Sequence, residues 1–264
     1  MLPLVSVIMP AHDAERYIGK AIQSVIAQTY ENWELLVVDD GSSDGTRAVV
    51  HDADSRRIRY FHQENAGPAR SRNRGISAAV GEYGVFLDAD DWLDSQALQV
   101  LLSAFAGELQ ECAVAHGNWA LADDFGAVGE AHSSALPHED PLQNLVLHNP
   151  FAVHAAAVRL GAVREVGGFD PTEPGLEDWD LWLRMALRGH RFVHVPRLVA
   201  LYRWRPDSRS KNIAKMRADR LATLERFWAA ADVPRSLREH KPRSYASAHL
   251  DFCVARFAEG NTPA

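Results

Sequence analysis

Cysteine is scarce in this chain, with Cys112 and Cys253 the only two among 264 residues. Such a pair supports neither a disulfide framework nor a zinc site made of cysteines, so we expect a reducing compartment. No apolar run approaches the roughly 18 residues of a membrane-spanning helix. The first ten residues, MLPLVSVIMP, lack the basic segment and cleavage site of a signal peptide. These absences predict a cytoplasmic protein, either free or peripheral at the inner face of the membrane.

The sequence also lacks the glycine-rich loops of two common nucleotide-binding folds. The first apolar run ends in PAHDAERY (residues 10–17) rather than GxGxxG, and no GxxxxGK[ST] occurs. These absences argue against a dinucleotide-binding Rossmann enzyme and a P-loop enzyme. The histidines form no HExxH or other cluster along the chain. A net charge of −7 argues against nucleic acid as a partner.

Short apolar runs alternate with segments of helical period through the first 110 residues. The runs, which predict buried strands, are residues 4–9, 34–38, 58–62 and 83–87. The helical segments between and after them are residues 18–26, 46–53, 68–80 and 95–108. This alternation predicts an α/β fold with a mostly parallel sheet and helices on both faces.

Acidic and turn-forming residues follow three of these predicted strands. They occupy residues 11–13, 39–45 and 88–91. Ligands of parallel α/β sheets bind outside the carboxyl ends of the strands, so we expect these segments to meet in one site. Asp88, Asp90 and Asp91 repel one another unless a cation lies between them, and oxygen ligands suit Mn²⁺ or Mg²⁺. The alternative is a solvated acidic turn that caps the next helix.

Five motifs in this order together resemble the family 2 glycosyltransferases. They are VSVIMPAHDAERYIGKAIQSVIAQTYENWELLVVDDGSSDGT, NAGPARSRNRGI, FLDADD, VGGFD and EDWDLWLR. The resemblance covers about residues 3–210. It implies a Rossmann-like GT-A catalytic domain over residues 1–210, with a nucleotide-binding half (1–110) and an acceptor-binding half (111–210). Residues 211–264 are predicted to be a C-terminal helical extension.

The resemblance implies a nucleoside-diphosphate sugar donor. The residues it places at the nucleotide are Pro10, Ala11, His12, Asp13, Asp40, Arg72, Asp88, Ala89 and Asp90. Asp40 is expected to hydrogen-bond the base, and a carboxylate can accept from the N3–H of uracil, which favours UDP. His12 replaces the Tyr that stacks on the base in many relatives. Metal ligation is expected from Asp90 and Asp91, although the sequence does not apportion the three acids.

The resemblance assigns the chemistry to Glu177 and Asp178, with Asp178 as the general base. Inversion requires one base to take the proton of the acceptor hydroxyl. The first turn of a helix would tend to keep this carboxylate ionised. Arg205 occupies the position at which many relatives carry a histidine, and it would pair with the diphosphate instead of a metal. Trp179 and Asn149 are predicted on the acceptor side.

The implied acceptor is a hydroxyl of a saccharide or of a lipid-linked molecule, as in polysaccharide biosynthesis. Phe227 and Trp228 in the extension suggest contact with a membrane, a homodimer, or packing on the protein's own domain. Two other functions stay open. One is a catalytically idle relative that binds a nucleotide sugar and a partner, supported only by His12 and Arg205. The other, a sugar nucleotidyltransferase, usually carries a glycine-rich basic loop after the first strand, unlike PAHDAERY.

Overall fold

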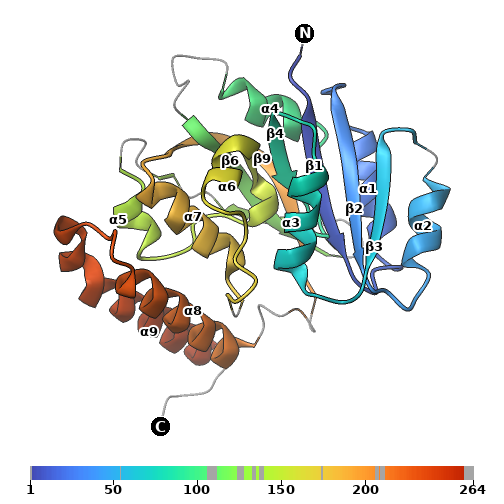
Figure 1. Ribbon diagram of the computed structural model, residues 1–264. Coiled ribbons are helices and arrows are strands. Elements are labelled where there is room, and N and C mark those ends of the chain that lie inside the picture. Colours follow the sequence, from blue (N-terminus) through green and yellow to red (C-terminus); the bar gives the residue numbers. More distant parts are fainter. Residues whose placement is uncertain are drawn as a thin grey trace.

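The sheet and its covering helices run through both predicted halves of the catalytic domain (Figure 1). The computed structural model describes residues 2–53, 55–105, 112–123, 128–132, 135–136, 140–173, 175–205, 208 and 212–258. In these residues the strands form one nine-stranded sheet with the order β3-β2-β1-β4-β8-β6-β9-β5, and β7 pairs with β6. No boundary in the sheet separates residues 1–110 from the residues that follow.

The strands run mostly in one direction. They are β1 (Val5–Ala11), β2 (Trp33–Asp40), β3 (Ile58–Gln63), β4 (Tyr83–Phe86), β5 (Trp92–Leu93), β6 (Cys112–Ala122), β7 (Val128–His132), β8 (Ala156–Arg159) and β9 (Arg191–Arg203). β8, β5 and β7 are antiparallel to their neighbours, and the other pairs are parallel. The predicted mostly parallel α/β sheet is therefore confirmed.

Helices cover both faces of the sheet (Figure 1). They are α1 (Ile18–Ile26), α2 (Thr46–Asp52), α3 (Pro68–Ala78), α4 (Ala97–Ser103), α5 (Leu142–Leu145), α6 (Leu160–Glu165), α7 (Glu177–Leu187), α8 (Ile213–Ala229) and α9 (Lys241–Ala258). Two 3₁₀ turns, Val153–Ala155 and Arg235–His240, complete the described helical structure. The short α6 and the two-residue β5 were not predicted, because segments of that length carry little periodicity.

Alternation along β1 explains the two-sided core. Val7 and Met9 belong to the apolar cluster that contains α1 and α4, whereas Ile8 belongs to the cluster on the other face, with Phe86 and α3. Successive side chains of a strand point to opposite faces, so a continuous apolar run is what a sheet covered on both faces requires. The carboxyl ends of β1, β2 and β4 then meet at one edge of this rigid layer.

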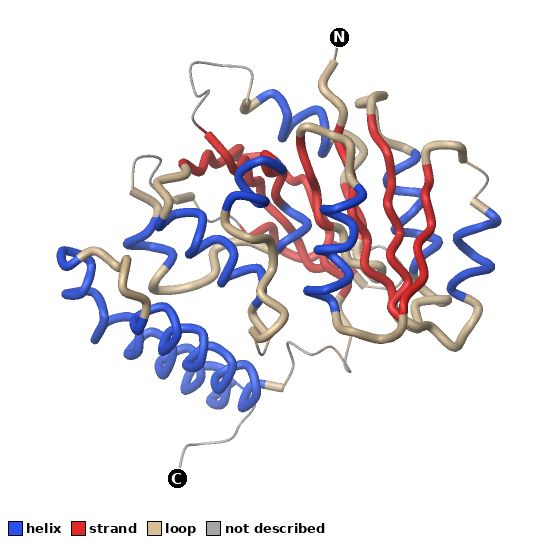
Figure 2. The backbone as a smooth tube through the Cα atoms, viewed as in Figure 1, coloured by secondary structure: helices blue, strands red, loops and turns tan. Residues whose placement is uncertain are grey.

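The C-terminal extension is helical, as predicted, and α8 and α9 lie side by side along one flank (Figure 2). Phe227 and Trp228 of α8 are 7% and 2% exposed, and the Trp228 indole donates to Ser244 Oγ of α9 at 3.0 Å. Of the three expected alternatives for these two residues, the structure therefore shows packing on the protein's own domain. Within the described residues, no helix has the length and apolar character needed to cross a membrane.

Candidate active site

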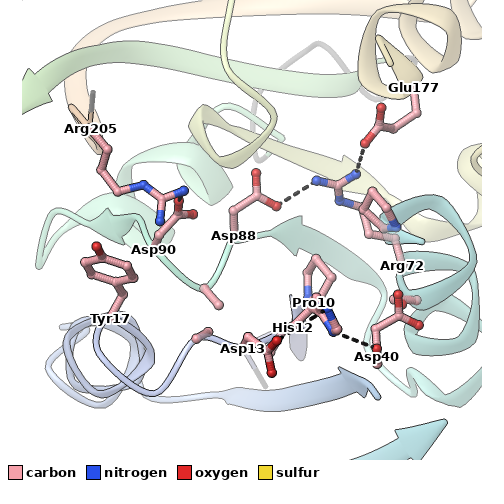
Figure 3. A pocket seen from close by; sticks show the side chains of 15 residues that line it. Pro10, His12, Asp13, Tyr17, Asp40, Arg72, Asp88, Asp90, Glu177 and Arg205 are labelled. Atoms are coloured by element: carbon pink, nitrogen blue, oxygen red, sulfur yellow. Dashed lines mark hydrogen bonds and ion pairs between the residues drawn. The ribbon is translucent and has the colours of Figure 1, made fainter. Parts of the chain in front are cut away.

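The carboxyl ends of the central strands enclose a hollow of about 290 Å³, here called the strand-end pocket (Figure 3). Its lining residues are Pro10, Ala11, His12, Asp13, Ala14, Tyr17, Asp40, Pro68, Ser71, Arg72, Asp88, Ala89, Asp90, Glu177 and Arg205. All nine residues predicted at the nucleotide are in this set. The structure therefore brings together segments that are far apart in the chain.

One wall of the pocket is a pair of loops locked to each other. The backbone N–H of Asp13 donates to Ser42 Oγ at 3.0 Å, and Asp13 Oδ1 accepts from the backbone N–H of Ser43 at 2.7 Å. Asp13 has a φ of 44°, which is uncommon for a residue other than glycine. Residues with such backbone angles are found most often at functional sites, where the surrounding contacts hold them in place before a ligand binds.

Asp40 connects the end of β2 to the start of α3. Its Oδ1 accepts from Gln63 Nε2 at 2.7 Å and from the backbone N–H of Ala66 at 2.9 Å, and its Oδ2 accepts from the backbone N–H of Gly67 at 2.7 Å. Each carboxylate oxygen has two lone pairs, so Oδ2 can accept one further N–H from a ligand. Its neighbour Asp39 is 1% exposed and does not line the pocket.

Arg72 joins two acidic segments that are far apart in sequence. Its guanidinium lies 2.6 Å from Asp88 Oδ1 and 2.9 Å from Glu177 Oε1 (Figure 3). Arg72 is 4% exposed, and the two carboxylates outweigh its burial and raise its pKa. The resemblance placed Arg72 at the nucleotide. In the structure its two terminal nitrogens pair with carboxylates, so Arg72 holds Asp88 and the start of α7 in place, and it also lines the strand-end pocket.

Asp90 faces the pocket together with a cation. Arg205 Nη2 lies 3.0 Å from Asp90 Oδ2, and Arg203 Nε donates to the backbone carbonyl of Asp90 at 2.8 Å. Burial raises the pKa of Asp90, and so does the charge of Asp88. The aromatic ring of Tyr17 lies against both guanidiniums, with Cζ of Arg203 at 4.9 Å and Cζ of Arg205 at 5.0 Å from its centroid. Tyr17 was not predicted as a site residue.

Asp91 does not line the strand-end pocket and is 2% exposed. Its Oδ1 accepts from the backbone N–H of Arg203 at 2.7 Å, and its Oδ2 lies 3.2 Å from His154 Nδ1. Burial, and after it the charges of Asp90 and Asp88, raises the pKa of Asp91 well above its ordinary value. Asp91 thus also fixes the end of β9, from which Arg205 follows.

Asp88, Asp91 and His154 form a group with the chemistry of a metal site. One ligand atom from each lies within 4.8 Å of the others. His154 is 1% exposed, neither ring nitrogen has a hydrogen-bond partner among the described residues, and burial lowers its pKa to about 4. Ligands at right angles around an ion about 2.1 Å away lie about 3 Å apart, close to the 3.2 Å between Asp91 and His154. These residues therefore fit a divalent ion.

Asp178 lies in a second hollow of about 340 Å³, here called the carboxylate cavity. Its lining residues are Arg72, Asp88, Asp90, Asp91, Asn149, Val153, Gly175, Leu176, Glu177, Asp178, Tyr202, Arg205, Ser208 and Met216. The residues it shares with the strand-end pocket are Arg72, Asp88, Asp90, Glu177 and Arg205. A molecule in either hollow can therefore contact these five side chains.

The environment of Asp178 alters its acidity. Asn149 Nδ2 donates to Asp178 Oδ2 at 3.0 Å, and the backbone N–H of Trp179 donates to Oδ1 at 2.7 Å. Burial, and after it the charge of Glu177, raises the pKa of Asp178 to about 6. Desolvation thus acts more strongly on the pKa of this carboxylate than the first turn of the helix does, and the carboxylate is ionised above about pH 6.

The two predicted acceptor residues differ in position. Asn149 lines the carboxylate cavity and holds Asp178. Trp179 is 0% exposed, its indole donates to the carbonyl of Leu145 at 2.7 Å, and it does not line this cavity. It lines a neighbouring hollow, which it shares with Asn149. Sequence inspection also did not predict that His154 lies beside Asp91, and its one signal is that it is a polar residue inside the apolar segment FAVHAAAV.

The sheet and its covering helices have the GT-A glycosyltransferase fold. A mannosyltransferase from Pyrobaculum calidifontis, solved with GDP-Man and Mn²⁺, superimposes with a TM-score of 0.70 at 18% identity, over 100% of this chain and 77% of that one. Residues 6–166, more than half of the chain, match the sequence profile described as Glycosyl transferase family 2. The chain belongs to glycosyl transferase family 2.

Two curated relatives illustrate the family. A Bacillus subtilis protein, provisionally named the teichuronic acid biosynthesis glycosyltransferase TuaG, is 30% identical over 216 residues, which cover 80% of this chain and 82% of the relative. The Escherichia coli protein WfgD, named as a UDP-Glc:α-D-GlcNAc-diphosphoundecaprenol β-1,3-glucosyltransferase, is 39% identical over 128 residues, covering 48% and 50%. The chain spans about half or less of several relatives that it matches.

Proposed function

We propose that this protein is an inverting, metal-dependent glycosyltransferase. It would move a sugar from a nucleoside-diphosphate donor, with UDP favoured, to a hydroxyl of a saccharide or a lipid-linked acceptor. The observation that supports the proposal is that the strand-end pocket and the carboxylate cavity meet at a shared wall. The predicted nucleotide residues line one of them, Asp178 lies in the other, and five side chains are common to both. A donor and an acceptor can therefore approach each other at this junction.

In the proposed reaction, Asp178 accepts the proton of the acceptor hydroxyl. The oxygen attacks the anomeric carbon of the donor, the bond from that carbon to the diphosphate breaks, and the diphosphate leaves with the electron pair. Attack from the opposite face inverts the anomeric centre and needs one base only. Asn149 and the backbone N–H of Trp179 orient the carboxylate through their hydrogen bonds.

Asp88, Asp91 and His154 would hold the divalent ion. Two carboxylates suit Mn²⁺ or Mg²⁺, and the imidazole nitrogen favours Mn²⁺ of the two. The ion supplies stabilisation of the negative charge on the leaving diphosphate. This set adds His154 and Asp88 to the predicted ligand Asp91, and it leaves Asp90 paired with Arg205.

Arg205 would contact the diphosphate directly. It lines both hollows and lies beside Asp90, which the family resemblance places at the donor. A planar guanidinium can form two parallel hydrogen bonds to a phosphate. Tyr17 would keep Arg205 in position by packing against it.

Nucleotide binding can be measured by thermal shift with UDP, dTDP, GDP and CDP, each with and without Mn²⁺. A ligand that binds only the folded state raises the melting temperature, by about 5 °C or more at a hundredfold excess over its Kd. We expect the largest shift for UDP with Mn²⁺. His154→Gln should remove the Mn²⁺-dependent part. His116→Gln, at a buried histidine outside both hollows, should keep it. No shift with any nucleotide would overturn the proposal and favour the idle relative.

The pH dependence of turnover tests Asp178 as the base. Because the pKa of Asp178 is raised to about 6, the carboxylate is ionised above that pH and protonated below it. We expect kcat/KM to be flat near pH 7–8 and to fall about tenfold per pH unit below about 6. The Mn²⁺-dependent UDP shift, measured over the same range, separates loss of the base from loss of binding. An acid limb near pH 4 would contradict the assignment.

A further inference from the structure

The C-terminal helices build a third hollow of about 310 Å³, here called the helical pocket. Its lining residues are His148, Asn149, Leu176, Trp179, Ile213, Met216, Arg217, Arg220, Ala248 and Phe252. Six of these ten residues come from α8 and α9, which lie outside the segment that matches the family profile. The pocket thus forms where the extension packs on the catalytic domain.

The helical pocket adjoins the carboxylate cavity. Asn149, Leu176 and Met216 line both hollows. Asn149 also donates to Asp178, and its side-chain oxygen is buried without a hydrogen-bond partner among the described residues. A molecule whose hydroxyl reaches Asp178 can therefore extend past Asn149 into the helical pocket, where that oxygen can accept a hydrogen bond from it.

Most of the pocket wall is apolar. Leu176, Ile213, Met216, Ala248 and Phe252 contribute hydrocarbon or aromatic surface. A free saccharide, with a hydroxyl on nearly every carbon, would bury polar groups against this wall without compensation. A hydrocarbon chain would gain free energy by burying apolar area there.

Two guanidiniums interrupt the apolar wall. Arg217 Nη2 lies 2.8 Å from His249 Nδ1, and its Cζ lies 4.6 Å from the centre of the Phe252 ring. Among the residues that the structure describes, Arg217 forms no ion pair with a carboxylate, and its Nε is buried without a hydrogen bond. Arg220 lies one turn further along α8; its Nη2 donates to the carbonyl of Leu147 and lies 3.2 Å from Ser247 Oγ, and its Cζ lies 5.6 Å from the centre of the Trp179 ring. Two guanidinium charges on one wall suit a phosphate group, with Arg217 as the direct contact and Arg220 as added positive charge beside it.

The outer face of α8 and α9 has the properties of a surface that contacts membrane lipid. Leu250 and Val254 of α9 are 62% and 60% exposed and lie one turn apart. Residues 212–258 carry more basic than acidic side chains, although the whole chain has a net charge of −7. A basic, partly apolar surface attracts anionic lipid.

We propose that the helical pocket binds the phosphate and the first part of the hydrocarbon chain of a lipid-linked acceptor. This inference rests on the proposed function, since it assigns the acceptor class of the same active site. The sugar that receives the new glycosyl unit would lie at Asp178, the phosphate at Arg217 and Arg220, and the chain along the apolar wall toward α9.

The test uses decyl phosphate, below its micelle concentration, as a probe of the whole chain by isothermal titration calorimetry. Decyl maltoside supplies the same chain without a phosphate, and inorganic phosphate supplies the anion alone. We expect decyl phosphate to bind at least about tenfold more tightly than either, because both halves of the pocket are then used. Arg217→Gln should weaken it at least about tenfold, whereas Arg217→Lys should lose less. Arg243→Gln, at an exposed arginine of α9 outside the pocket, is the matched control.

Equal affinity for decyl phosphate and decyl maltoside, or undiminished binding of decyl phosphate by Arg217→Gln, would overturn the inference. Should Arg217→Gln unfold, Ile213→Trp provides a second variant, because the larger side chain fills the pocket and should abolish binding. UDP binding is measured in every variant. If UDP binds and decyl phosphate does not, the acceptor site is wrong and the donor site stands. If UDP does not bind wild type, the proposed function itself fails.

Discussion

Replacing Asp178 with asparagine is expected to lower kcat for sugar transfer about 10³-fold while leaving UDP binding unchanged. General bases contribute about 10² to 10⁴ in rate, and asparagine cannot accept the hydroxyl proton. The substitution preserves the shape of the side chain and can keep the hydrogen bond with the backbone N–H of Trp179. Because Asp178 does not line the strand-end pocket, donor affinity should not depend on it.

The matched control for this variant is Asp180→Asn. Asp180 lies in the same first turn of α7 but pairs with Arg184 and lines neither hollow. It should retain wild-type kcat within a few-fold. Product formation from UDP-sugar and a lipid-linked acceptor, measured at saturating donor and Mn²⁺, gives both rates. Asp178→Asn with more than a tenth of the wild-type kcat would exclude Asp178 as the base.

Arg72→Met is expected to destabilise the fold by about 3 kcal/mol, because it leaves two carboxylates without their cation. Arg72 has a side chain that is 5% exposed, against 12% for Glu177 and 31% for Asp88. The partial exposure of Asp88 lets water replace part of the lost interaction, so the lower end of the range for a broken buried pair applies. In a chain of this size the loss lowers Tm by about 6–12 °C.

A double variant separates charge from packing at this position. Glu177→Gln in the Arg72→Met background removes one of the two uncompensated charges, so we expect part of the lost stability to return. Urea unfolding of wild type, both single variants and the double variant measures this coupling. Arg72→Met with a loss below about 1 kcal/mol would show that the bridge seen in the structure does not hold the site together. Restored stability should not restore turnover, since Asp88 and α7 would still lack their common anchor.

Several features of this protein follow from local sequence alone. Apolar runs such as residues 4–9 and the helical periodicity after them are short-range patterns, and they predicted the mostly parallel α/β sheet that the structure contains. The acids at the ends of three strands predicted which segments meet, because the carboxyl ends of parallel strands share one edge. The family motifs then indicated which residues to expect at a donor.

The tertiary structure alone decided the contacts between distant segments. Arg72 and Glu177 are 105 positions apart, and nothing in either neighbourhood specifies that they pair. His154 reaches Asp91 only because β8 inserts between β4 and β6. The raised pKa of Asp178 depends on burial, which no local pattern sets. Periodicity fixes the buried face of an element. Which other elements it contacts is decided only by tertiary packing. That packing brings together the charged residues of the candidate active site and the residues that line the helical pocket.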